Sequence, residues 1–81
     1  MVTFQDASGV RWVAGAREED TPRHHGRWYL ILHPEGEQDA VLALPEVRWQ
    51  TRATAERTLE TMSVFELRRR LDIARRRAAP A

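Results

Sequence analysis

The chain has 81 residues, contains no cysteine, and carries 13 basic against 12 acidic side chains, for a net charge of +1. The lack of cysteine excludes a disulfide framework and a cysteine-rich zinc site, and the near balance of charge is unlike that of a dedicated nucleic-acid binder. Because 42% of the residues are hydrophobic, we expect one folded domain over residues 1–81 and not a disordered chain.

Compositional bias and the first residues predict the source and the compartment. All 13 basic residues are arginine, and lysine and asparagine are absent, which indicates a GC-rich genome and hence a bacterial source. No apolar run approaches the roughly 18 residues that a membrane span needs. The first residues, MVTFQDASG, lack the basic and apolar regions of a signal peptide, so we expect a cytoplasmic protein.

Two short apolar runs at the start of the chain predict a β-hairpin. VTFQ at 2–5 and VRWVA at 10–14 flank DASG at 6–9, whose Asp, Ser and Gly favour a turn. Residues 15–26 are polar, with a glycine at each end and Pro22 inside, and this pattern predicts a loop.

The middle of the chain predicts three further strands. RWYLILH at 27–33 has apolar side chains on both faces, which is typical of a central strand covered on both sides. After a turn over PEGEQD at 34–39, AVLAL at 40–44 predicts a strand that Pro45 ends. VRWQTRA at 47–53 alternates apolar with polar residues, and we interpret it as a half-solvated strand.

The C-terminal third predicts one helix. Residues 54–62 have fair helix propensity but a weak apolar face, so we interpret them as a connector, either a loop or a loose helical turn, between a β-sheet module over 1–53 and a helix over 63–78. Ser63 and Glu66 have the spacing of a capping box, in which Ser63 caps the N–H of Glu66 and Glu66 reaches back to the N–H of Ser63.

Apolar residues recur along this helix at a 3-4-3-4 spacing, and we expect the resulting stripe to pack on the sheet. Met62 would pack on Leu67 across the helix start as a hydrophobic staple. The i,i+4 pairs Glu66–Arg70 and Asp72–Arg76 would add a few tenths of a kcal/mol each. The stripe consists of Val64, Leu67, Leu71, Ala74 and Ala78.

The expected fold class is therefore α+β: a small, strongly bent antiparallel sheet of four or five strands with one C-terminal helix packed on it. An SH3-like barrel is the alternative arrangement of five short strands. Trp28, Tyr29 and Leu30 resemble the tripeptide of WYL domains, which are small Sm-like barrels in bacterial regulators that sense ligands or nucleic acid. The resemblance covers these three residues, and it implies no site residue.

The C-terminal helix also carries the principal candidate for a binding surface. Phe65 and Ile73 lie roughly opposite the apolar stripe, with Arg69 and Arg76 beside them. Interfaces favour this mixture of aromatic and arginine side chains. These four residues predict a face that docks a protein partner or a second copy of the chain. The alternative is that Phe65 folds into the first turn of the helix and that Ile73 is a single exposed apolar residue, which is common.

Nucleic acid is the alternative partner, and the chain would then be an accessory nucleic-acid-binding protein, for example one associated with transcription. Residues 1–60 hold seven arginines against ten acidic residues, whereas residues 61–81 hold six against two, so positive charge gathers at the C-terminal end. Arginines there and on the strand over 47–53 could bind phosphates weakly and without sequence preference. The candidate residues are Arg48, Arg52, Arg68, Arg69, Arg70, Arg75, Arg76 and Arg77.

We find no pattern typical of an enzyme. The two serines, Ser8 and Ser63, are explained as a turn residue and a cap, and the glycines form neither a phosphate-binding loop nor a dinucleotide fingerprint. His24 and His25 are adjacent in a loop, and a metal site that adds His33 or Asp20 to them has no fixed geometry. The sequence predicts a non-catalytic binding or regulatory module without metal, cofactor, small-molecule substrate or membrane contact.

Overall fold

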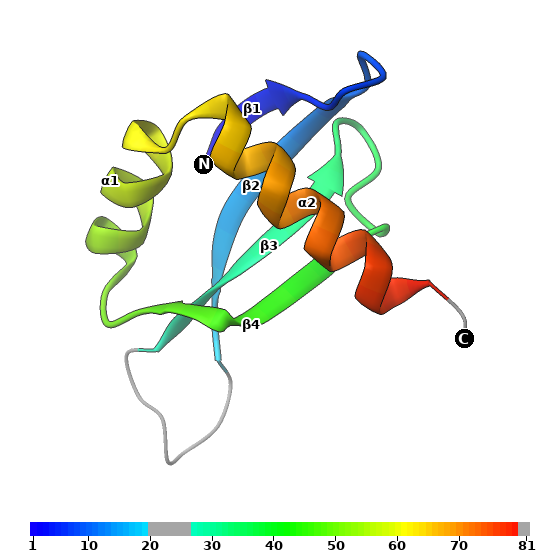
Figure 1. Ribbon diagram of the computed structural model, residues 1–81. Helices are drawn as coiled ribbons and strands as arrows, with labels where there is room; N and C mark the ends of the chain where they lie inside the picture. Colours follow the sequence, from blue (N-terminus) through cyan, green and yellow to red (C-terminus); the bar gives the residue numbers. More distant parts are fainter. Residues whose placement is uncertain (20–26, 80–81) are drawn as a thin grey trace.

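Four strands pair in chain order to form one antiparallel sheet, and two helices follow them (Figure 1). The computed structural model describes residues 1–19 and 27–79. The elements are β1 (Val2–Gln5), β2 (Arg11–Glu18), β3 (Trp28–Pro34), β4 (Leu42–Trp49), α1 (Arg52–Thr61) and α2 (Val64–Ala78).

The predicted hairpin at the start of the chain is confirmed. β1 pairs with β2, and the turn between them closes through the N–H of Asp6, which donates to the carbonyl of Val10 at 2.8 Å. Gly9 adopts a φ of 87°, which lies in the left-handed region that glycine tolerates. β2 continues through Glu18, so the loop predicted from residue 15 begins later, and its residues 20–26 lie outside the described part of the chain.

β3 is the central strand that its sequence predicts, because it pairs with both β2 and β4. Leu30 and Leu32 on one face are completely buried. Tyr29, Ile31 and His33 on the other face are only half-buried, so this face is less covered than we expected.

β4 replaces two predicted strands with one, and the prediction of a separate strand over residues 47–53 is wrong. The pairing with β3 jumps from Leu44 to Arg48, so residues 45–47 bulge out of the ladder. Pro45 has no N–H to donate, which explains why the ladder breaks there without ending the strand. The Arg48 Nε–H donates to the Pro45 carbonyl at 2.6 Å and closes the bulge.

α1 is a helix where we expected a connector, so the number of helices is two instead of one. Thr51 caps its start by accepting the N–H of Thr54 at 3.1 Å, and Ala55 and Leu59 are buried one turn apart. Among the described residues β1 and β4 do not pair, so the sheet is open and the SH3-like barrel is not confirmed.

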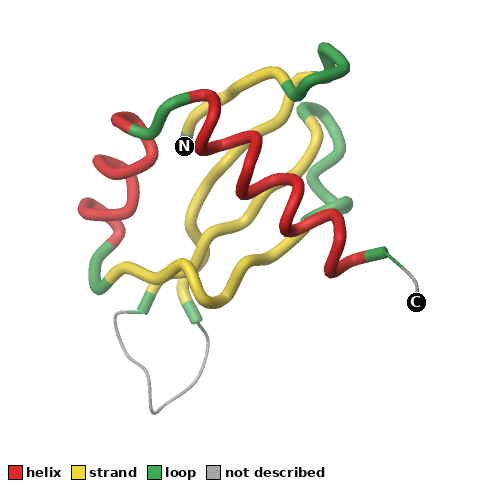
Figure 2. Tube along the Cα trace, in the orientation of Figure 1, coloured by secondary structure: helices red, strands yellow, loops and turns green. Residues whose placement is uncertain are grey.

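α2 crosses the sheet from β1 to β4, as Figures 1 and 2 show. Leu67, Leu71 and Ala74 are buried against the sheet, whereas Val64 and Ala78, expected in the same stripe, are exposed. Leu59 of α1 belongs to the same core cluster, so both helices and the sheet share one hydrophobic core. No helix in residues 1–19 and 27–79 is long and apolar enough to cross a membrane.

Candidate docking surface on helix α2

The first turn of α2 sets the position of its outward side chains. Ser63 Oγ accepts the N–H of Glu66 at 3.2 Å, which is half of the predicted capping box. The Glu66 carboxylate does not reach back to the N–H of Ser63, as the capping box predicted. It lies instead 2.9 Å from Arg70 Nε and 3.9 Å from Arg69 Nη1. Phe65 is therefore held in the first turn and points to solvent, with 79% of its surface exposed.

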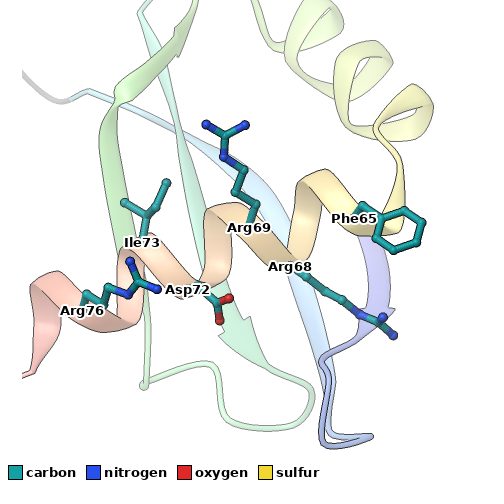
Figure 3. Close-up of a pocket in the computed structure, with 6 residues that line it drawn as sticks. All are labelled: Phe65, Arg68, Arg69, Asp72, Ile73 and Arg76. Atoms are coloured by element: carbon teal, nitrogen blue, oxygen red, sulfur yellow. The ribbon is translucent and has the colours of Figure 1, made fainter.

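An open depression runs along the outward face of α2, and we call it the α2 hollow (Figure 3). Phe65 and Arg76 mark its two ends. The residues of the predicted docking face all line it, and two further residues do so as well. The lining consists of Phe65, Arg68, Arg69, Asp72, Ile73 and Arg76.

The apolar residues of the α2 hollow differ in exposure. Phe65 is a free anchor, but Ile73 is half-buried and packs against the core, so it is not opposite the core as the helical projection suggested. Ile73 thus lines the hollow only with the part of its side chain that the core leaves exposed, and its packing against the core fixes its position. The exposed aromatic ring of Phe65 is the part of the hollow suited to contact with an apolar side chain of a partner.

The sequence-based set of docking residues omitted Arg68 and Asp72. Arg68 Nε donates to the carbonyl of Gln5 in β1 at 2.8 Å, which turns the side chain along one side of the hollow. Asp72 lies on the same side (Figure 3). Both residues follow the 3-4 spacing that relates Phe65, Arg69, Asp72 and Arg76, and this spacing was the signal that could have identified them.

Arg75 is directed away from the α2 hollow, into the hairpin between β1 and β2. Its Nη2 lies 2.7 Å from Asp6 Oδ2, and its guanidinium stacks on the Trp12 ring at 4.7 Å. Asp6 is only 3% exposed and also accepts from the Trp12 Nε1–H and from the N–H groups of Ser8 and Val10. Arg75 thereby joins α2 to the hairpin, and its Nη2 is already paired with a carboxylate of the same chain.

The pKa of Asp6 reflects two opposed effects. Burial raises the pKa of this carboxyl, but the hydrogen bonds from Arg75, Ser8, Val10 and Trp12 together outweigh burial. The pKa of Asp6 is therefore held well below its usual range. Asp6 is thus an ionised partner for Arg75 at neutral pH.

The remaining arginines of the nucleic-acid hypothesis point in several directions, and most have partners. Arg77 pairs with Glu46, whose pKa is lowered by a hydrogen bond from its own N–H and by Arg77. Arg48 lies 2.6 Å from Glu19, and Arg52 lies 3.2 Å from Glu56.

Arg76 is the exception among these arginines. The predicted pair with Asp72 is not formed, since no salt bridge within 4.0 Å joins Asp72 to Arg76. In the part of the chain that the structure describes, Arg76 has neither an ion pair nor a hydrogen bond. Its charge is therefore available to a partner at one end of the α2 hollow.

No group of three or more metal-ligating side chains gathers within residues 1–19 and 27–79. His33 lies in β3, with its Nδ1 2.9 Å from the Pro34 carbonyl. His24 and His25 lie outside the described residues. The α2 hollow is the candidate site. It can make apolar contacts through Phe65 and Ile73, and its arginines can pair with anionic groups of a partner.

Comparison with known proteins adds no relative to this description. No protein-family model matches the chain, and neither a curated protein nor a solved structure matches it.

Proposed function

We propose that the chain is a small, non-catalytic binding module that docks onto a protein partner through the α2 hollow. The observation that carries this proposal is the exposure of Phe65, at 79%, on a capped and firmly packed helix. An aromatic side chain held in water by a rigid helix costs free energy that a partner could recover by covering it. Arg69 next to it and Arg76 at the other end of the hollow supply the polar rim that interfaces commonly have.

Nucleic acid is the less favoured partner. Apart from Arg76, each arginine of that hypothesis lies near a carboxylate or a carbonyl of the same chain. A phosphate would have to displace these groups, and Asp72 in the α2 hollow would repel it. The hollow also offers phenylalanine at one end and no aromatic platform at the other, where a strand of stacked bases would need one.

The test is a selection of displayed random peptides on the immobilised chain. We expect peptides that bind the wild-type chain to lose at least about tenfold in affinity for Phe65→Ala, because truncation of an aromatic anchor commonly costs more than about 1 kcal/mol. Val64→Ala is the matched control, since Val64 is a neighbouring exposed residue that does not line the hollow. Circular dichroism would verify that both variants fold. Selected peptides that bind both variants as tightly as the wild type would refute docking at this face.

A further inference from the structure

We infer that the occupant of the α2 hollow is an acidic segment that carries an apolar side chain, and this inference rests on the proposed docking function. Three guanidinium groups line the hollow against one carboxylate, that of Asp72, so the lining has a net charge of +2. Glu66 does not cancel this charge, because it lies closer to Arg70, at 2.9 Å, than to Arg69, at 3.9 Å. The Arg69 side chain stays 74% exposed.

The arginines of the hollow have unused donors. Arg68 contributes its Nε–H to the Gln5 carbonyl, and its terminal nitrogens have no hydrogen bond among the described residues. Arg76 has no partner there either. Guanidinium groups bind carboxylates through paired hydrogen bonds, so two or more acidic side chains of a partner could be held at once. Phe65 would cover an apolar residue of the partner at its own end of the hollow.

A second copy of this chain fits the hollow poorly. A symmetric pair of α2 helices that places Phe65 on Ile73 of the other copy has its twofold axis at residue 69, midway between them. The two Arg69 side chains would then face each other, and two linings of +2 charge would be brought together. Like charge therefore disfavours self-association through this face and favours a partner of opposite charge.

The length of the hollow sets the length of the segment. Phe65 and Arg76 are separated by about 16 Å along the helix axis, at a rise of about 1.5 Å per residue. An extended segment covers this distance with about five residues, and a helical one with about eleven. Carboxylates near both ends and an apolar residue near the Phe65 end would match the lining.

The experiment uses random peptides of about 12 residues, displayed and selected on the full chain, and synthetic copies of the recovered peptides. We expect the recovered peptides to be enriched in Asp and Glu together with an apolar residue. Binding, measured by fluorescence anisotropy, should weaken several-fold as the salt concentration rises from about 0.1 to 1 M, where the Debye length falls from about 10 to 3 Å. Arg76→Gln should weaken binding about fivefold at low salt.

Asp72→Asn is the most direct test of the acidic occupant, because it should increase the affinity where most substitutions decrease it. It removes the negative charge from the lining, so affinity for an acidic peptide should rise by about two- to fivefold at low salt. Asp39→Asn is the matched control, because Asp39 is exposed in the turn before β4 and does not line the hollow. An unchanged or lower affinity for Asp72→Asn, or recovered peptides without excess acid, would overturn the acidic occupant.

The same peptides distinguish a failure of the acidic occupant from a failure of docking at the α2 hollow. Peptides of any composition that still require Phe65 would overturn the acidic occupant and leave docking intact. Peptides that do not require Phe65 would overturn docking itself. Sedimentation velocity that shows a dimer, dissociated by Phe65→Ala, would replace the acidic segment with a second copy. Single-stranded DNA that competes with the peptides at equal affinity would overturn the preference for an acidic peptide.

Discussion

At the scale of single residues, Asp6 and Arg75 connect the two ends of the chain. Asp6 lies in the turn of the first hairpin and Arg75 near the end of α2, and their carboxylate and guanidinium are 2.7 Å apart. The Asp6 side chain also organises its own turn through the N–H groups of Ser8 and Val10. One buried carboxylate therefore holds a local turn and a long-range contact, and its loss should affect both.

The pKa of Asp6 makes this contact dependent on pH. Because the folded pKa lies below the unfolded value of about 3.9, the stabilisation is fully present above that value and is lost as pH falls below it. We expect the thermal midpoint of the wild type to fall between pH 5 and pH 2 more steeply than that of Asp6→Asn. Asp6→Asn should also lower the midpoint at pH 7, since Arg75 loses its ionised partner. Near-UV circular dichroism, which reports on the packing of the three tryptophans, Trp12 among them, would measure both thermal midpoints.

Asp39→Asn serves as the control for general acid effects, because Asp39 is exposed and its side chain has no hydrogen bond or ion pair within the described residues. Its acid profile should follow that of the wild type. Equal slopes for Asp6→Asn and the wild type would mean that other carboxylates cause the acid unfolding.

At the scale of elements, the sequence predicted the parts that local chemistry determines. The turn at Gly9, the strand at 27–33 and the helix after Ser63 all have signals within a few residues, and the structure has each of them. The bulge in β4 could not be predicted this way, because Pro45 ends a strand unless its partner strand tolerates unpaired residues. That tolerance depends on β3, which is distant in sequence.

α1 was missed for a related reason. It contains Thr54, Thr58 and, as its last residue, Thr61, and threonine has only moderate helix propensity. The helix is stabilised by burial of Ala55 and Leu59 against the sheet. Helix propensity alone does not include this contribution from tertiary packing. The same limit affected Ile73, whose contact with the core depends on how α2 crosses the sheet. The four predicted docking residues nevertheless line one hollow, because helical spacing alone brings them together.

The cap of α1 supplies a test at this scale. Thr51→Ala removes the oxygen that accepts the N–H of Thr54, and we expect the free energy of unfolding in urea to fall by about 1 kcal/mol. Thr51→Ser keeps the oxygen and should stay within a few tenths of a kcal/mol of the wild type. If Thr51→Ala and Thr51→Ser unfold at the same urea concentration, the cap does not stabilise α1.

At the scale of the whole molecule, the charges of the two parts are opposite in sign and partly paired with each other. Residues 1–60 have an acidic excess and residues 61–81 a basic excess, and the contacts Arg75–Asp6 and Arg77–Glu46 join the two parts across the sheet. Several arginines of α2 are thus paired with carboxylates of the same chain. The positive charge that remains lies along the outward face of α2, at the hollow.

This distribution predicts a weak response to nucleic acid. A dedicated binder presents many free cations to the phosphate backbone, and its affinity falls steeply with salt. In an NMR titration of the labelled chain with short single- and double-stranded DNA, we expect no saturable shifts in residues 68–77 at about 200 mM salt, and only slight shifts at about 50 mM. An acidic peptide recovered by selection should shift the same residues at both concentrations, which shows that the amides report on binding.

Saturable, strongly salt-dependent shifts with DNA, spread over Arg70, Arg75 and Arg77 as well as the hollow, would mean that these ion pairs open for phosphate. The chain would then have to be regarded as a nucleic-acid-binding protein.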